Sequence, residues 1–309
     1  YTTPEGQMLS LPFNSSTPVL YYNRAQFEAA GLDADTPPRT WGEMSDAIDA
    51  LQASGVACGL TTGWQSWVHL ENFSAWHDVP LGTLQNGFAG LGTELVFNDT
   101  VAVDHIAMLG EWQKNKKLDY GGRRSNALPK FYSGECAFYT GSSASYAGVR
   151  ANVDFPFGIA MLPYHDDVEG APQNSIIGGA TLWVLQGHDQ ADYAGVARFF
   201  TYMSSPEVQA DWHQSTGYLP ITYAAYELTQ EQGFYEKNPG TATSIEQMTL
   251  NPPTDQSKGL RFGSFVQIRD IINEELEAVW AGDKTAEEAL DAAVARGNEL
   301  LRRFEADNS

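Results

Sequence analysis

Hydrophobic and polar positions follow two periods along this chain, one typical of helices and one typical of strands. Thr40 and Glu43 form a capping-box pair, and an apolar stripe over 44–51 predicts a helix that ends near Gly55. The apolar run 56–60 then predicts a short buried strand. Helix and strand in alternation are typical of an α/β domain.

The stretch 12–23 changes from polar to apolar within a few residues. Ser15 and Ser16 stand in its polar part, and a β-prone run follows that ends at Asn23, where a helix cap is predicted. Such a change suits a crossing between two lobes, with hydroxyl groups left for a ligand. The run 217–220 interrupts a later helical pattern and predicts a second crossing.

Two junctions could present N–H and hydroxyl groups to an anion. Gly141, Ser142 and Ser143 follow a predicted strand and open a predicted helix, whose free N–H groups and dipole would stabilise an anion. The alternative is that Ser142 only caps its own helix. Gly179 precedes a predicted strand at 181–185, and it permits either a close backbone approach to a ligand or an ordinary tight turn.

Arg269 lies on a predicted, mostly apolar helix at 267–280. The guanidinium fork suits bidentate binding of phosphate, and the alternative is a surface ion pair with Asp270. Trp64 and Trp67 stand in a Gly- and Ser-containing loop. Their indole rings could form the base of a polyol or sugar pocket, or bind a quaternary ammonium. Core packing is the alternative for this pair, and it is expected for other tryptophans: Trp41, Trp112, Trp183, Trp212 and Trp280.

The composition excludes several classes of partner and of enzyme. A length of 309 residues allows about two domains, and 18 Lys and Arg against 39 Asp and Glu give a net charge of −21. This charge argues against nucleic acid and anionic membranes as partners. Motifs of dinucleotide, nucleoside triphosphate, serine hydrolase and zinc enzymes are absent from the sequence, and the histidines show no ligand spacing. We therefore expect no catalytic residue, no cofactor and no metal.

Cys58 and Cys136 are the two cysteines of the chain. They are compatible with one disulfide in an oxidising compartment or with two buried thiols, and the sequence leaves both open.

Runs across nearly the whole chain match one family. They are LPFNSSTPVLYYN at 11–23, GWQ at 63–65, LENFSAW at 70–76, WHQ at 212–214, TGYLPIT at 216–222, EQGFYEKNPG at 231–240 and RGNELLRRFE at 296–305. With these runs the sequence resembles the periplasmic sn-glycerol-3-phosphate-binding proteins of Ugp-type ABC importers, within extracellular solute-binding protein family 1.

The resemblance implies a type II periplasmic binding fold, in which two α/β lobes are joined by crossing strands and the solute lies in the cleft. It places the glycerol end of the ligand against Trp64 and Trp67. It places the phosphate contacts on five residues: Ser16, Ser142, Gly179, Tyr218 and Arg269.

The resemblance also implies how the lobes divide the chain. Segments 17–158 and 219–309 are expected to form the second lobe, and segments 1–16 and 159–218 a remnant of the first lobe with the hinge segments. Members of the family continue upstream of this start, and that part supplies a Tyr and a Glu to the ligand. We therefore expect the first lobe to be incomplete in this chain.

The function implied is a solute receptor and not an enzyme. It would bind sn-glycerol 3-phosphate, glycerophosphodiesters such as glycerophosphocholine, or both, and deliver them to an ABC permease in the inner membrane. A periplasmic monomer, secreted with a signal peptide that this chain lacks, is expected. Two alternatives are a sugar or oligosaccharide receptor of the same fold, and a phosphodiesterase or glycosidase with a carboxylate pair.

Overall fold

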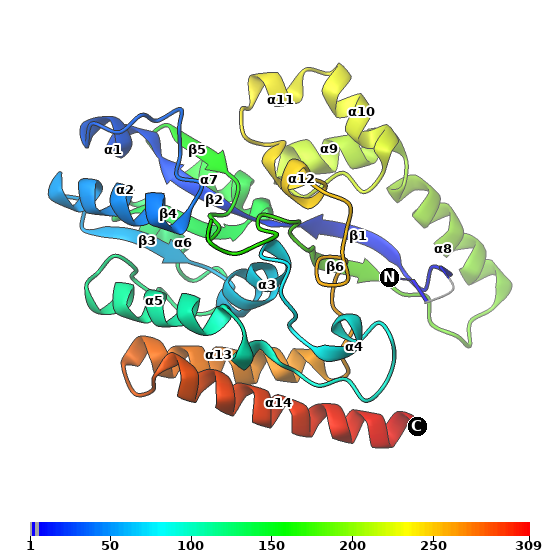
Figure 1. Ribbon diagram of the computed structural model, residues 1–309. Helices are drawn as coiled ribbons and strands as arrows, with labels where there is room; N and C mark the ends of the chain where they lie inside the picture. The colour runs from blue at the N-terminus through cyan, green and yellow to red at the C-terminus, as the bar shows by residue number, and fades with distance from the viewer. Residues whose placement is uncertain (1, 4–5) are drawn as a thin grey trace.

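The computed structural model describes residues 2–3 and 6–309 and contains two sheets joined by a crossing (Figure 1). In the larger sheet β3 and β4 are parallel, and β2 is antiparallel to both β4 and β5. Its strand order is β3 (Cys58–Thr62), β4 (Cys136–Ser142), β2 (Pro18–Asn23) and β5 (Phe157–Ala160). The smaller sheet pairs β1 (Leu11–Ser16) with β6 (Gly178–Leu182) in antiparallel fashion. The expected α/β class is confirmed.

Helices follow or separate these strands along the chain. They are α1 (Arg24–Ala29), α2 (Trp41–Ala53), α3 (Phe73–Trp76), α4 (Thr83–Asn86), α5 (Ala102–Lys114), α6 (Leu128–Tyr132), α7 (Tyr146–Asn152), α8 (Gln190–Met203), α9 (Pro206–Thr216), α10 (Tyr223–Glu231), α11 (Phe234–Lys237), α12 (Thr243–Met248), α13 (Phe265–Ala281) and α14 (Ala286–Asn308). Three shorter elements are a π-helix η1 (Trp67–Asn72) and the 3-10 helices η2 (Phe97–Asp99) and η3 (Ser143–Ser145).

The stretch 12–23 is the crossing that its pattern predicts. Thr17 alone separates β1 from β2, although the two strands belong to different sheets. The second predicted crossing runs beside it, since the Leu219 N–H donates to the Ser15 carbonyl at 2.7 Å. Gly217 ends α9 with φ 87°, a left-handed conformation that favours glycine. The two segments therefore cross together.

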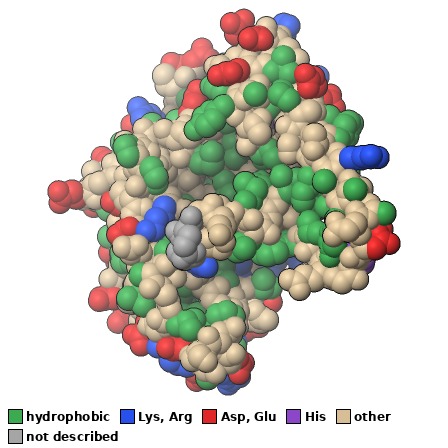
Figure 2. Space-filling view, turned by 90° about the vertical axis from the view of Figure 1, so that its right-hand side faces the viewer, with side chains coloured by type: hydrophobic (Ala, Val, Ile, Leu, Met, Phe, Trp, Pro, Cys, Tyr) green, Lys and Arg blue, Asp and Glu red, His purple; other side chains and the backbone are tan. Residues whose placement is uncertain are grey.

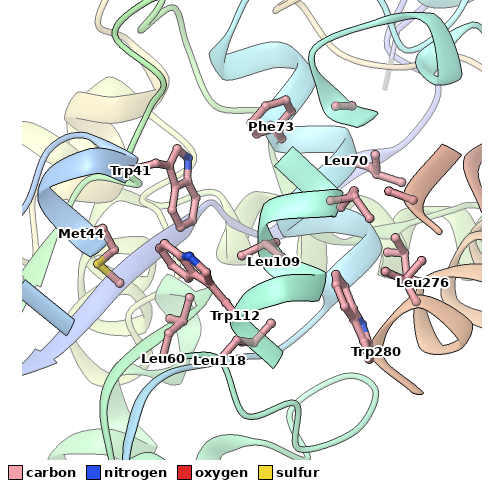
Figure 3. Packing of buried hydrophobic residues seen from close by; sticks show 14 of the residues in the cluster. Trp41, Met44, Leu60, Leu70, Phe73, Leu109, Trp112, Leu118, Leu276 and Trp280 are labelled. Carbon is pink, nitrogen blue, oxygen red and sulfur yellow. The ribbon is translucent and has the colours of Figure 1, made fainter. Parts of the chain in front are cut away.

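Strand β2 anchors the core of the larger sheet because all its residues are buried. Alternate side chains point to opposite faces of a strand. Leu20 and Tyr22 join the main core, which α2, α5, α13 and α14 complete (Figure 3). Val19 and Tyr21 belong to a second cluster on the other face, with residues of α6 and α7. Burial on both faces explains why β2 reads as a continuous apolar run.

Local sequence signals predict the helix ends well and the strand ends less well. The capping box of Thr40 and Glu43 is confirmed at the start of α2, and a second box opens α14. The strand predicted at 56–60 is β3 at 58–62, and the strand predicted at 181–185 is β6 at 178–182. The second prediction was wrong because Gly178 and Gly179 pair with β1 and belong to the strand itself.

Cys58 and Cys136 are joined by a disulfide between the parallel neighbours β3 and β4, with their Cα atoms 4.5 Å apart. The disulfide decides between the two alternatives that the sequence leaves open.

No helix within the described residues has both the length and the apolar character needed to cross a membrane.

The prediction of core packing is wrong for Trp183, which is 61% exposed. Leu185, Phe199 and Tyr202 are also exposed on or near β6 and α8. Figure 2 looks onto the side of the molecule where β1, β6 and α8 lie, and hydrophobic side chains gather over the middle of this face. The resemblance assigns this segment to the first lobe, and the division into lobes stays a prediction.

Four of the six histidines lie together in the main core. His69 and His105 nitrogens are 3.2 Å apart, as are those of His105 and His165. His77 lies beside them and accepts the backbone N–H of His165 through Nε2 at 2.8 Å. The described residues contain no group of three or more metal-ligating side chains placed to hold an ion. The cluster is therefore a hydrogen-bonded part of the core.

Candidate functional site

All seven residues predicted for the ligand line one cavity of about 690 Å³. They come from segments far apart in the sequence: the crossing strands, the loop before η1 and η1 itself, the β4–η3 junction, and α13. The seven are Ser16, Trp64, Trp67, Ser142, Gly179, Tyr218 and Arg269.

The floor of the cavity at the smaller sheet depends on close backbone contact. Ser16 pairs with Gly178, and Ser15 pairs with Gly179. Gly179 has φ 133°, and a Cβ there would collide with the Asn14 carbonyl. A side chain is therefore excluded by the backbone of β1. Gly179 lies within β6 and not in a tight turn, and its approach to a ligand stays a prediction. The Asn14 side chain completes this corner by accepting the Ala180 N–H at 2.8 Å.

Ser142 ends β4 and caps the turn that follows. Its Oγ accepts the Ala144 N–H at 3.2 Å, so the capping alternative describes one of its roles. A hydroxyl has one proton to donate besides its acceptor lone pairs. Ser142 can therefore cap η3 and still donate a hydrogen bond into the cavity that it lines.

Tyr218 reaches the cavity from the second crossing. Its backbone is held on both sides, since its N–H donates to Thr216 Oγ1 at 3.2 Å and its carbonyl contacts His213 Nδ1. His213 is in turn 2.9 Å from the Tyr235 hydroxyl, and burial lowers the pKa of its ring. A neutral His213 therefore fixes the segment that carries Tyr218.

Arg269 does not pair with Asp270, so that alternative was wrong. It makes a bidentate ion pair with Glu71, with Nε–Oε1 and Nη2–Oε2 distances of 2.7 and 2.5 Å. Its guanidinium also lies 4.8 Å from the Phe265 ring centroid. Burial lowers the pKa of Arg269, but the charge and hydrogen bonds of Glu71 leave it raised above its usual value. The guanidinium is therefore always charged and firmly oriented.

The two tryptophans differ in how they meet the cavity. Trp64 is 40% exposed, and its indole N–H donates to Ser125 Oγ at 3.2 Å. Trp67 is 6% exposed and packs with Val68, Trp76 and Leu162, so core packing is part of its role. Its Nε1 is buried without a hydrogen-bond partner among the described residues. The indole of Trp64 is therefore open to the cavity, whereas the mostly buried indole of Trp67 can contact it only along one edge.

Sequence reasoning missed a basic loop that lines the same cavity. Arg123 makes a bidentate ion pair with Glu277 at 2.8 and 2.6 Å. Arg124 has no acidic partner within 4.0 Å in the part of the chain that the structure describes. Two arginines after a pair of glycines, in a chain of 18 basic residues, were the signal that could have found this loop.

Comparisons with known proteins identify the family of this chain. A sequence model described as bacterial extracellular solute-binding protein matches residues 1–243. The periplasmic sn-glycerol-3-phosphate-binding protein UgpB of Escherichia coli is 55% identical over 97% of this chain and 68% of its own length. The UgpB protein of Salmonella typhimurium is 54% identical over the same shares.

Solved structures of lower identity show the same fold. UgpB from Mycobacterium tuberculosis, in complex with glycerophosphocholine, superposes with a TM-score of 0.75 at 22% identity, over 96% of this chain and 72% of that one. The cyclic alpha-maltosyl-1,6-maltose binding protein of Arthrobacter globiformis gives 0.75 at 22% identity, over 97% and 73%. With the family match over most of its length and relatives at 55% identity, this chain belongs to the bacterial extracellular solute-binding protein family.

Proposed function

We propose that this protein is the solute receptor of an ABC importer and that it binds sn-glycerol 3-phosphate, a glycerophosphodiester, or both. One observation carries the proposal. The seven residues that the resemblance assigns to the ligand line a single cavity, in a chain 55% identical to a glycerol-3-phosphate-binding protein. The seven positions are spread from 16 to 269 in the sequence and come together at this cavity, as one binding site requires.

The chemistry of the lining suits a phosphate ester. Hydroxyl donors at Ser16 and Ser142 and the guanidinium of Arg269 can donate to phosphate oxygens. The indoles of Trp64 and Trp67 can pack against the carbon atoms of the glycerol. Both ends of the ligand would then be recognised in one cavity.

The cellular setting and the absence of catalysis are part of the same proposal. The relatives are named as periplasmic binding proteins, which supports a periplasmic location and an ABC permease as partner. A receptor holds its solute between two lobes that close around it, and it releases the solute unchanged. We propose a monomer without catalytic residues, cofactor or metal.

Calorimetry on the intact protein tests the proposal. Titration with sn-glycerol 3-phosphate and with glycerophosphocholine is expected to give saturable binding to at least one of them. Absence of heat with both ligands would overturn the proposal. Incubation with glycerophosphocholine, followed over hours for free glycerol 3-phosphate, tests the enzyme alternative, and we expect no product.

A sugar receptor remains the second candidate because the open indole of Trp64 is a surface on which a sugar ring could stack. Solved sugar-binding proteins share the fold, but at 22% identity or less they support the fold alone. Competition between maltose and sn-glycerol 3-phosphate separates the candidates. We expect the phosphate ester to bind and excess maltose to leave its affinity unchanged.

A further inference from the structure

Glu71 is a buried carboxylate in direct contact with the cavity arginine. Its side chain is 0% exposed, and both of its oxygens accept from Arg269. Its charge has no other ion-pair partner within 4.0 Å among the described residues. A buried carboxylate needs such a partner, because taking a charge out of water is costly. Arg269 therefore cannot turn away from Glu71 without leaving that charge uncompensated.

The geometry of the pair leaves the outer end of the guanidinium available. An arginine has five N–H groups in a planar fork. Glu71 uses one on Nε and one on Nη2, so the two on Nη1 and the second on Nη2 remain. The guanidinium carbon lies over the Phe265 ring, 4.8 Å from its centroid. The remaining N–H groups thus form a fork of fixed direction on a residue that lines the cavity.

The element that carries Glu71 also belongs to the site. The π-helix η1 begins at Trp67, which lines the cavity, and ends at Asn72. Asn72 donates to the Trp67 carbonyl at 3.1 Å and accepts the Ile176 N–H at 2.8 Å, just before β6. Single-turn π-helices are frequent at functional sites. One short element therefore fixes Trp67, the approach to β6 and, through Glu71, Arg269.

We propose that Glu71 is a positioning residue of the binding site, which holds the guanidinium of Arg269 so that its outer N–H groups face an anionic ligand. The inference rests on the proposed function, and the ligand class is the phosphate ester named there. Glu71 itself does not touch the ligand. Its carboxylate also cancels the formal charge of Arg269, so the pair binds an anion through directed N–H groups more than through net charge.

Glu71→Gln is the most direct variant. A glutamine of the same shape offers one acceptor and one donor, so one N–H of Arg269 would face another N–H and the bidentate contact would be lost. Calorimetry with sn-glycerol 3-phosphate on the intact protein is expected to show binding weakened on the order of 10-fold. Unchanged or tighter binding by a folded Glu71→Gln protein would overturn the inference.

A double-variant cycle separates positioning from a general structural effect. In an Arg269→Gln background, adding Glu71→Gln is expected to change the affinity by less than about twofold, since Glu71 acts through Arg269. An equal loss in both backgrounds would contradict the inference. If Glu71→Gln does not fold, Glu71→Asp replaces it. The shorter carboxylate keeps the charge but cannot reach both nitrogens, so we expect weaker binding, and wild-type affinity would contradict the inference.

Glu275→Gln is the matched control. Glu275 is a buried carboxylate on the same helix as Arg269, and it pairs with Lys284 and Arg296 outside the cavity. We expect it to lower thermal stability and leave the affinity unchanged. The two claims fail separately: a wild-type protein that binds no phosphate ester refutes the proposed function, whereas equal binding by wild type and Glu71→Gln refutes only the role of Glu71.

Discussion

Arg269 combines a fixed position with free hydrogen-bond donors. We expect Arg269→Ala to weaken binding of sn-glycerol 3-phosphate by about 1.5–3 kcal/mol, the range for hydrogen bonds to a charged group. The change also leaves Glu71 buried without its partner, so thermal unfolding has to be measured beside calorimetry. Arg303→Ala, at a 73% exposed position on α14, is the control and should change neither quantity. Wild-type affinity in a folded Arg269→Ala protein would remove Arg269 from the site.

Replacing Trp64 and replacing Trp67 should affect stability differently, because only Trp67 is buried. Trp67→Ala removes a buried indole, and such changes cost about 3–5 kcal/mol of unfolding free energy. Trp64→Ala removes a ring that is 40% exposed, so it should weaken ligand binding with little change in stability. Urea unfolding and calorimetry on both variants check this. Wild-type affinity in a folded Trp64→Ala protein would contradict the assignment of Trp64 to the ligand.

At the scale of elements, the histidine cluster, of which His69 lies in η1, makes the main core sensitive to acid. Burial lowers the pKa of His69 to about 3 and that of His77 to about 4. His77 cannot accept a proton at Nε2 without losing the His165 N–H bond. An unfolded histidine has a pKa of about 6.5, so protons bind preferentially to the unfolded chain. The stabilising effect is complete above about pH 6.5 and declines as pH falls toward 4.

We therefore expect the free energy of unfolding to fall between pH 7 and pH 5, on the order of 1 kcal/mol per pH unit for each of His69 and His77. Urea unfolding at both pH values measures it. His188 is exposed, so His188→Gln should keep the pH dependence of wild type. A free energy of unfolding that is equal at pH 7 and pH 5 would show that the cluster does not resist protonation.

The ends of helices and strands could be predicted where the residues that determine them are close in sequence. They were missed where an end depends on a pairing strand far away in the sequence. Thr40 and Glu43 are three residues apart and specify the start of α2 without help from the rest of the chain. The start of β6 depends on pairing with β1, which lies more than 160 residues earlier in the sequence. The local hydrophobic pattern therefore predicted a strand that begins three residues too far along the chain. Glu71 was missed for the same reason, because Arg269 lies 198 residues away.

At the scale of the whole molecule, the fold class followed from alternating helix and strand patterns, but the site did not. Residue types alone favoured a structural explanation for Ser142 and Gly179, and they left Arg269 with two equal explanations. Only the resemblance brought them together with Tyr218, and the structure then placed them in one cavity. Convergence of this kind depends on tertiary contacts that no local pattern encodes.

The net charge of −21 predicts how salt acts on binding. An anionic ligand is repelled at long range, and salt screens this repulsion beyond about 10 Å at 0.1 M. Glu71 cancels the charge of Arg269 at short range. Raising NaCl from about 50 to about 300 mM should therefore speed association and change the affinity by less than about threefold. Stopped-flow kinetics and calorimetry measure the two quantities, and a tenfold loss of affinity would indicate binding by exposed charge.

A crystal structure of the intact protein with sn-glycerol 3-phosphate tests the central claim most directly. We expect phosphate oxygens within about 3.2 Å of Ser16 Oγ, Ser142 Oγ and the outer nitrogens of Arg269. The glycerol carbons should lie against Trp64 and Trp67. An empty cavity at saturating ligand, or ligand bound away from these residues, would contradict the account.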